Sequence, residues 1–235
     1  AISRSEAAFE RESLLEEAAL AAKDFAGDAP RAIGYLEQLL ELRKDDARVE
    51  NNLERLYERE GQSRPLIELL SRRLDKLTGT PLEELRLRIA GLWIELNDAR
   101  QAFTLIDQTL DGGTGSGEAY QLLERILALP VPPHSLPPTG DGSRRRRAMS
   151  VRDEVAARLK THYESLGQTE DVVRMLEVEL EAAPGKAELE ERLGELVHIC
   201  LTRLDDPLAA FKHLTELVGL APGSEKYRTE LDELA

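Results

Sequence analysis

Pairs of adjacent apolar residues recur along this chain at nearly constant intervals. The pairs are Ala32-Ile33, Leu66-Ile67, Ala102-Phe103, Val172-Val173 and Ala210-Phe211. Their first residues are separated by 34, 36, 70 and 38 positions, and the third interval spans two periods of 35. Four residues after each pair begins, another apolar residue follows: Leu36, Leu70, Ile106, Leu176 and Leu214. The period predicts stacked supersecondary units, none of which can bury its apolar face alone.

Turn and capping residues fall at matching positions between these pairs. A turn residue stands five positions before each pair, namely Gly27, Gly61, Asn97, Gly167 and Asp205. Gly and Asn tolerate the left-handed backbone that ends a helix. Residues suited to a helix start follow: Asp28, Ser63, Asp98, Thr169 and Asp206. The pattern predicts about a dozen helices of roughly 12 to 20 residues in antiparallel pairs.

The composition agrees with a helical protein. Only 4% of the 235 residues are aromatic, and Leu, Ala and Glu dominate, which favours helices over sheets. Cys200 is the single cysteine, so a disulfide framework within the chain is excluded. No apolar run approaches the ~18 to 20 residues of a membrane span. We therefore expect a protein without a membrane span, and its location is expected to be cytoplasmic.

Three segments resemble the end of the first helix of a tetratricopeptide repeat (TPR), in which an aromatic residue precedes a turn residue by four positions. They are Tyr57 to Gly61, Trp93 to Asn97, and Tyr163 to Gly167. Ala32 and Ala102 resemble the small residue early in the second helix. The resemblance implies a right-handed α-solenoid of antiparallel helix pairs, with the aromatic residue wedged between the helices of a pair. The early Trp of the family is missing, so other helical-pair solenoids remain the alternative.

A segment rich in Pro, Gly and Arg interrupts the repeats. Residues 130–147 hold five Pro and two Gly, which excludes a continuous helix through this range. We expect helical repeats at 1–129, a flexible loop at 130–147 and helical repeats again at 148–235. The chain starts without a Met, and Leu231 and Leu234 would leave an apolar face open at its end. These features suggest a piece of a longer repeat protein.

The net charge of −14 argues against a nucleic-acid partner. The charge is about −8 over residues 1–129 and about −9 over 148–235, so both helical blocks would repel a phosphate backbone. The loop between them is basic, because it ends in Arg144, Arg145, Arg146 and Arg147. This run is interpreted as a solvated linker, with contact to an acidic partner, to RNA or to the chain's own acidic helices as alternatives.

No motif for catalysis, cofactor binding or metal binding is found. The glycine-rich residues 112–117 lack the preceding strand and the following Lys-Ser/Thr of a phosphate loop, so they indicate a turn between repeats. His198 and Cys200 stand two residues apart on one helix and face different directions. No nucleophile–base constellation appears. We expect no enzyme activity, no cofactor and no metal.

The resemblance implies a concave groove lined by first helices, which would bind an extended peptide or a helix of another protein. The groove positions are expected at Arg48, Asn51, Asn52, Arg55, Glu84, Leu87, Arg88, Arg158 and Arg192. Leu87 is expected to be an exposed apolar contact. A carboxylate clamp is incomplete, because Glu17 and Ala21 stand where Lys and Asn are needed. A protein-interaction scaffold is the favoured function, and a structural spacer that contacts neighbours through its ends or loop is the alternative. The oligomeric state stays open.

Overall fold

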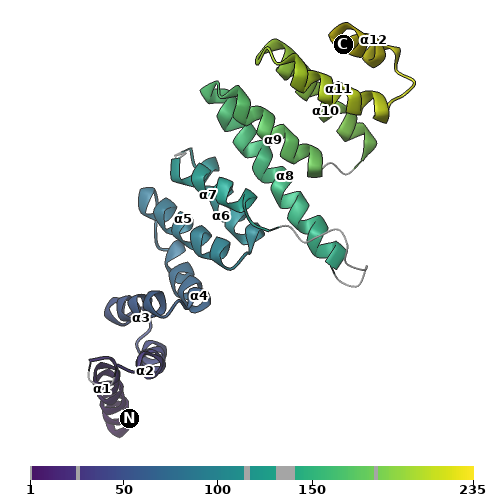
Figure 1. The fold of residues 1–235 in the computed structure, drawn as a ribbon. Helices are drawn as coiled ribbons and strands as arrows, with labels where there is room; N and C mark the ends of the chain where they lie inside the picture. Colours follow the sequence, from purple (N-terminus) through teal and green to yellow (C-terminus); the bar gives the residue numbers. More distant parts are fainter. Residues whose placement is uncertain (1, 25–26, 114–116, 131–140, 183–184) are drawn as a thin grey trace. The chain divides into compact units, whose positions relative to one another are not determined.

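The computed structural model is all-α in the residues that it describes, which are 2–24, 27–113, 117–130, 141–182 and 185–235 (Figure 1). The twelve helices of these ranges are α1 (Ile2–Asp24), α2 (Ala29–Leu42), α3 (Ala47–Arg59), α4 (Ser63–Leu74), α5 (Thr80–Glu95), α6 (Ala99–Asp111), α7 (Gly117–Leu127), α8 (Asp141–Leu166), α9 (Thr169–Ala182), α10 (Lys186–Thr202), α11 (Pro207–Leu220) and α12 (Glu225–Leu234). No described helix has both the length and the apolar character that crossing a bilayer requires.

The chain forms two compact units, Ala1–Leu96 and Asn97–Ala235. In unit 1, each of the helices α1 to α5 packs on the next one along the chain. In unit 2, α6 to α12 do the same, and α8 packs on α6 as well as on α7 and α9. The predicted architecture of sequential antiparallel helix pairs is therefore confirmed. Here α1, α3, α5, α8, α10 and α12 are called first helices, and α2, α4, α6, α9 and α11 second helices.

The predicted repeat frame supplies the cores of both units. The first residue of every apolar pair is at most 2% exposed, and so are Leu70, Ile106, Leu176 and Leu214 four residues later. The second residue of the pair is buried in α2, α4 and α6, half-buried in α9, and 36% exposed at Phe211. Because one face of each second helix carries these residues, the period of the sequence becomes a continuous row of buried side chains within each unit.

The predicted turns are confirmed at all five positions. Gly27, Gly61, Asn97, Gly167 and Asp205 have φ between 53° and 70°. A side chain strains this left-handed backbone, which is why Gly occupies three of the five positions.

Three of the predicted start residues are helix N-caps. The Asp28 and Asp98 carboxylates accept hydrogen bonds from the third backbone N–H that follows, and Asp206 accepts from two such groups. Ser63 and Thr169 are themselves the first residues of α4 and α9. These caps satisfy backbone donors that the first helical turn leaves unpaired.

The interrupted repeat differs from expectation in one respect. Helix α7 ends shortly before the Pro-rich segment, and residues 131–140 lie outside the described part. Helix α8 begins at Asp141, inside the range 130–147 that was expected to be a loop, so the backbone of residues 141–147 is helical. The Pro residues of the range all precede Asp141, and the Arg run that follows contains no helix breaker. The division into repeats at 1–129 and 148–235 stays a prediction.

The three predicted aromatic wedges are buried to different extents. Tyr57 is 5% exposed, and its hydroxyl donates to Glu37 Oε1 on α2 at 2.7 Å. Tyr163 is half-buried and donates to Glu124 Oε1 on α7 at 2.6 Å. Trp93 is half-buried, so the full burial expected of a wedge is found at Tyr57 alone among these three.

Candidate functional site

The groove residues predicted from the sequence all lie on first helices. Helix α3 carries Arg48, Asn51, Asn52 and Arg55, helix α5 carries Glu84, Leu87 and Arg88, helix α8 carries Arg158, and helix α10 carries Arg192. The α3 and α5 residues belong to unit 1, and Arg158 and Arg192 belong to unit 2. The candidates therefore form two separate sets, one in each unit.

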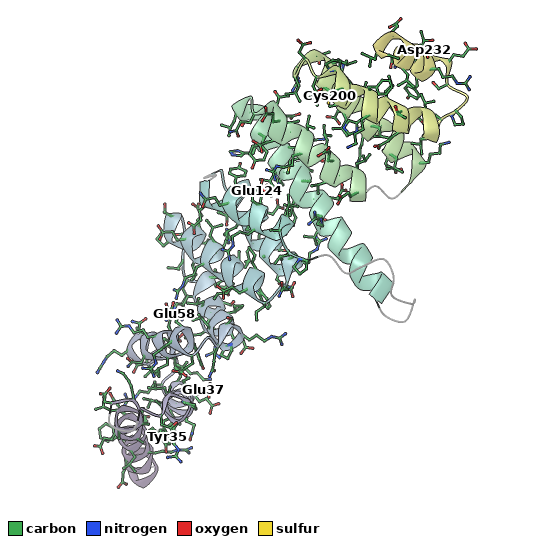
Figure 2. The ribbon with its side chains drawn as sticks, in the orientation of Figure 1. Tyr35, Glu37, Glu58, Glu124, Cys200 and Asp232 are labelled. Atoms are coloured by element: carbon green, nitrogen blue, oxygen red, sulfur yellow. The ribbon has the colours of Figure 1, made fainter. Side chains whose placement is uncertain are left out.

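In unit 1, Arg88 is part of an ion-pair network that joins α3, α4 and α5. Arg73 on α4 donates to Glu50 Oε2 at 3.0 Å and to Glu54 Oε2 at 2.7 Å. Arg88 donates to Glu54 Oε1 and Glu58 Oε1, both at 2.6 Å. Glu58 is labelled on α3 in Figure 2. The five side chains form a ladder in which charges alternate, and we call it the α3–α5 ladder.

The electrostatics of the ladder keep its central members charged. Burial of Glu54 raises the pKa of its carboxyl, but the hydrogen bonds and charges of Arg88 and Arg73 outweigh burial and hold this pKa below its ordinary value. Burial lowers the pKa of Arg88, and Glu54 and Glu58 raise it by more. Each oxygen of Glu54 accepts from one guanidinium, that of Arg73 on α4 or that of Arg88 on α5. Arg88 therefore joins α5 to α3 through this ladder.

The two candidate arginines of unit 2 are also paired within the chain. Arg158 Nη2 lies 2.6 Å from Asp107 Oδ1 and 2.7 Å from Asp111 Oδ1 on α6. Arg192 Nη2 lies 3.0 Å from Asp153 Oδ1 on α8, and Arg192 also donates to a backbone carbonyl of α9. Each of these side chains joins a first helix to a neighbouring helix. They are placed to stabilise the packing of the repeats.

The expectation that Leu87 is an exposed apolar contact is wrong. Its side chain is 3% exposed. Leu87, Ala90 and Ile94 are spaced by three and four residues, so they share one face of α5, and all three are buried. A second buried stripe on the same helix contains Leu85 and Ile89. Helix α5 thus buries a wider face than the single stripe that the repeat register assumes.

A cleft remains between the first helices α1 and α3 in unit 1. It encloses about 220 Å³. Its lining residues are Glu16, Glu17, Ala19, Leu20 and Lys23 on α1, Leu36 on α2, and Arg48 and Asn52 on α3. The second helix α2 supplies the floor, because Leu36 is buried between the two walls. We call this the first-helix cleft, and two of the predicted groove residues, Arg48 and Asn52, lie in it.

The first-helix cleft combines an exposed apolar side chain with polar groups that have no partner among the described residues. Leu20 is 54% exposed. The Arg48 guanidinium and the Asn52 amide form no hydrogen bond or ion pair with the described part of the chain. This distinguishes Arg48 from the paired Arg88, Arg158 and Arg192.

Leu20 is the functional candidate that the sequence reasoning missed. Helix α1 is apolar at many positions, and the stripe that it buries is Leu15, Ala19 and Ala22. Leu20 lies next to this stripe without belonging to it. In the sequence, Leu20 is visible as an apolar residue one position outside the i, i+4, i+7 pattern of the buried stripe. The sequence does not show which apolar stripe of α1 packs against a neighbouring helix, so Leu20 could not be identified as exposed.

The remaining groove candidates on α3 and α5 differ in their contacts. Asn51 Oδ1 accepts from Arg73 at 3.4 Å, which places it at the edge of the ladder. Arg55 and Glu84 are exposed and make no ion pair with the described residues. The side chains of Arg144 to Arg147 lie outside the described part, so their contact with a partner stays a prediction.

The described residues carry little chemistry of other kinds. No group of three or more His, Cys, Asp or Glu side chains within them is arranged to hold a metal ion. Cys200 is buried, and burial raises the pKa of its thiol, with Asp206 and Glu177 adding to the effect. A thiol with a raised pKa is a poor nucleophile at neutral pH. The surfaces of the repeats are therefore the candidate functional feature.

Solved structures that are similar to this chain over nearly its full length are TPR proteins. The TPR2AB domain of yeast Sti1, in a complex with pHSP90, is 13% identical, with 94% of this chain and 83% of that chain covered and a TM-score of 0.37. A TPR repeats protein of Bacteroides fragilis is 10% identical, with coverage of 95% and 97% and a TM-score of 0.35. The C-terminal part of a TPR repeat-containing protein of Cytophaga hutchinsonii is 14% identical, with coverage of 97% and 96% and a TM-score of 0.34.

No protein-family model and no curated protein sequence matches this chain. The identities above are low and the TM-scores lie below 0.5, so these likenesses carry no argument about a partner. The fold rests on the helix pairs themselves.

Proposed function

We propose that this protein is a non-catalytic scaffold that binds a peptide or helix of another protein in the first-helix cleft. The observation that carries the proposal is the combination of exposed Leu20 with Arg48 and Asn52, which have no partner among the described residues, across the cleft. Apolar anchors in a partly enclosed site, surrounded by polar groups that fix orientation, are the usual basis of peptide recognition.

The chemistry of the cleft indicates the chemistry of its partner. Leu20 and the floor residue Leu36 suit an apolar side chain. Arg48 suits a carboxylate of the partner, because its guanidinium has no counterion among the described residues. Glu16 is less available, since it already accepts a hydrogen bond from Arg43 at 3.1 Å. The expected partner is thus a segment with an apolar side chain and a nearby acidic one.

A pull-down with cleft variants of the full chain tests the proposal. The bait is the wild type or the double variant Leu20→Glu/Arg48→Glu, incubated with the native lysate. The matched control is Leu14→Glu/Arg64→Glu, since Leu14 is an exposed leucine of α1, Arg64 is an exposed arginine of α4, and neither lines the cleft. The proposal expects a partner that the wild type and control retain and the cleft variant loses. Equal recovery by all three baits would refute it.

An assembly role as a structural spacer is the second candidate, and an exposed apolar pair on α11 favours it. Leu208 is 79% exposed and Phe211 is 36% exposed. Phe211 occupies the frame position of Ile33, Ile67 and Phe103, which are at most 7% exposed. The variant Leu208→Ser/Phe211→Ser tests this role. Loss of self-association in sedimentation velocity would support a spacer, and an unchanged monomer in wild type and variant would exclude assembly through this pair.

A further inference from the structure

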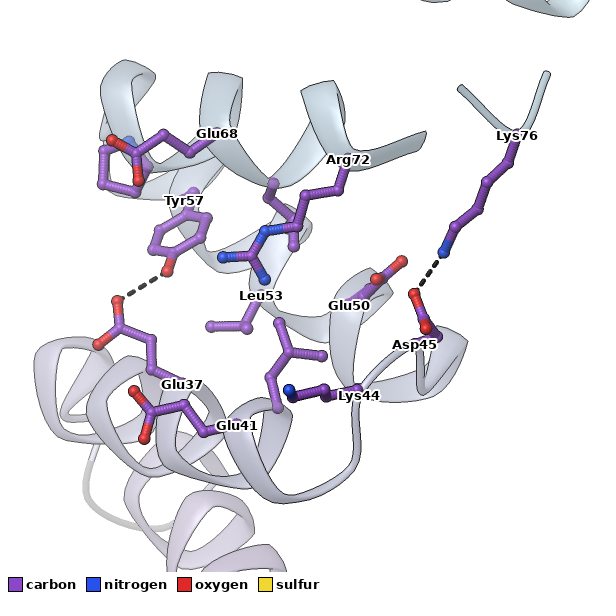
Figure 3. A pocket seen from close by; sticks show the side chains of 13 residues that line it. Glu37, Glu41, Lys44, Asp45, Glu50, Leu53, Tyr57, Glu68, Arg72 and Lys76 are labelled. Carbon is purple, nitrogen blue, oxygen red and sulfur yellow. Dashed lines mark hydrogen bonds and ion pairs between the residues drawn. The ribbon is translucent and has the colours of Figure 1, made fainter. Parts of the chain in front are cut away.

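A cleft of about 700 Å³ lies between the second helices α2 and α4 in unit 1, but its apolar floor is buried (Figure 3). Leu53 and Tyr57 on α3 form this floor and are 0% and 5% exposed. Figure 3 shows two interactions around the cleft that are formed within the chain, from Tyr57 to Glu37 and from Lys76 to Asp45. Large apolar side chains that a partner can reach are found instead on α11 in unit 2.

Helix α11 buries one side and exposes the opposite side. It packs on α10 and α12, and its buried side holds Ala210, Leu214 and Leu217. The exposed side holds Leu208, Phe211, Thr215 and Gly219. These four residues are spaced by three and four positions, so they form one row along the helix. We call this row the α11 stripe.

The α11 stripe has large apolar side chains in its first half and small residues in its second half. Leu208 is 79% exposed and Phe211 is 36% exposed. Gly219 has no side chain, and a Cβ placed there would meet no atom within 4 Å. The stripe therefore has a projection at Phe211 and a depression at Gly219. Thr215 lies midway between them, four residues from each.

This order makes the α11 stripe complementary to itself. When two copies of α11 pack antiparallel with Thr215 against Thr215, Phe211 of each copy lies at the level of Gly219 of the other, because both residues are four positions from Thr215. Leu208 then lies at the level of Pro222, which is exposed just after the end of α11. Side chains of one helix that fill gaps on the other are the basis of helix packing.

Two charged side chains beside the stripe show the same complementarity. Lys212 and Glu216 are exposed, lie along the same edge of the stripe and form no ion pair with the described residues. Lys212 stands three residues before Thr215, and Glu216 stands one residue after it. A two-fold axis at Thr215 brings the same edges of both helices together, so Lys212 of one copy and Glu216 of the other differ in level by about 3 Å. Two ion pairs can therefore form, one on each side of the axis.

We propose that the α11 stripe is the contact of a two-fold symmetric dimer of this chain, in which two copies of α11 pack antiparallel about Thr215. The inference rests on the assembly role given above as the second candidate function, and it names a second copy of the chain as the occupant of the exposed pair Leu208 and Phe211. Shape and charge both select this occupant, because the stripe itself supplies the projection, the depression and both signs of charge.

The dimer is expected to be weak and reversible. One helix face on each copy buries less than the ~1,200 Å² of a standard stable interface. Each copy also has a net charge of −14, which adds repulsion at long range. We expect a dissociation constant of about 10 to 100 μM. Two copies would therefore associate where their local concentration is high, as in a larger assembly.

Sedimentation velocity of the full chain over a range of protein concentrations tests the charge pairs. Lys212→Glu and Glu216→Lys should each weaken self-association at least about tenfold, because each variant places like charges at both contacts. An equimolar mixture of the two variants should associate like the wild type, since every contact then joins opposite charges. A loss of folding cannot imitate this recovery. The controls Arg64→Glu and Glu84→Lys change exposed charges of unit 1 and should leave self-association unchanged.

Cysteine cross-linking and a filled depression test the register. Under mild oxidation Thr215→Cys should form a disulfide-linked dimer, because the two copies of residue 215 face each other at the axis. Lys212→Cys should not, since its two copies differ in level by about 9 Å. The native Cys200 is buried and does not compete. Gly219→Leu should weaken self-association at least about tenfold, whereas it would strengthen a non-specific apolar contact.

The outcomes separate the packing geometry from the assembly role. Self-association that Leu208→Ser/Phe211→Ser abolishes, but that the charge variants and Gly219→Leu leave unchanged, would keep the assembly role and overturn the two-fold packing. Equal cross-linking of Thr215→Cys and Lys212→Cys would also overturn the packing alone. A wild type that stays monomeric at concentrations about tenfold above the expected dissociation constant would overturn both.

Discussion

Glu54 should contribute measurably to the stability of unit 1, because its carboxylate joins α4 and α5 to α3. Glu54→Gln keeps the shape of the side chain and removes the charge that both Arg73 and Arg88 contact. Glu54 is 16% exposed, whereas Arg73 is 24% and Arg88 is 38% exposed. A fully buried pair would lose ~3 to 5 kcal/mol when broken. Since these pairs are partly solvated, we expect a loss of about 1 to 2 kcal/mol in the free energy of unfolding.

The effect should depend on pH in a defined direction. The pKa of Glu54 is lower in the folded chain than its ordinary value, so ionised Glu54 favours the folded state. This contribution is complete above the unfolded pKa of about 4.3 and is lost as the pH falls through the lower, folded pKa. The difference between wild type and Glu54→Gln should therefore be full at neutral pH and disappear in acid.

Urea unfolding followed by tryptophan fluorescence measures this difference locally. Trp93 is the single tryptophan of the chain and lies on α5 in unit 1, so its signal reports the unit that contains the ladder. Glu84→Gln is the matched control, because Glu84 is an exposed carboxylate on α5, the helix that carries Trp93, and pairs with none of the described residues. The reasoning about the ladder would be refuted if Glu54→Gln lowered the free energy of unfolding at neutral pH by less than Glu84→Gln does. It would also be refuted if the loss caused by Glu54→Gln persisted in acid.

Three further predictions concern turn geometry, a buried histidine and the core. A Cβ at Gly167 or Gly194 would meet no atom within 4 Å, but Gly167 has φ +70°. Gly167→Ala should therefore lower the free energy of unfolding by about 1 kcal/mol, whereas Gly194→Ala, within α10, should raise it by about 0.5 to 1 kcal/mol. Urea unfolding followed by circular dichroism measures both changes. Burial, with Lys212 adding to it, lowers the pKa of His213, so the free energy of unfolding should decrease as the pH falls below the unfolded pKa of about 6.5. His213→Leu should remove that pH dependence, and an equal slope in the variant would contradict the assignment. Leu176→Ala removes a side chain that is 0% exposed and should cost ~2 to 5 kcal/mol in the same unfolding assay, so a cost below about 1 kcal/mol would contradict the repeat register.

Much of the fold was predictable from local sequence patterns. The apolar pairs mark the buried face of each second helix, because side chains three and four residues apart share a helix face wherever the helix lies. The five turn residues have positive φ as predicted, since this conformation is a local preference of Gly, Asn and Asp. The start of α8 was not predicted, because the Pro and Gly residues that disfavour helix all precede its first turn or lie within it.

The candidate site was predictable only as a set of positions. The sequence places Arg48, Arg88, Arg158 and Arg192 on first helices, and it treats them alike. The structure separates them, because three have carboxylate partners on other helices and Arg48 has none among the described residues. The partners of Arg88 and Arg73 stand 19 to 34 residues away in sequence. Which of many exposed carboxylates comes within reach depends on how one helix is rotated and shifted against the next.

The helical class of the fold, the repeat frame and the five turn positions could be predicted from the sequence, since each of these depends on interactions within one helix or one turn. The burial of Leu87, the exposure of Leu20 and the cleft between α1 and α3 became known only from the packed helices. These features depend on the separation of neighbouring helices, which is set by side-chain packing across repeats. A pattern along one chain does not encode that separation, so the surfaces available to partners appear only once the helices are packed.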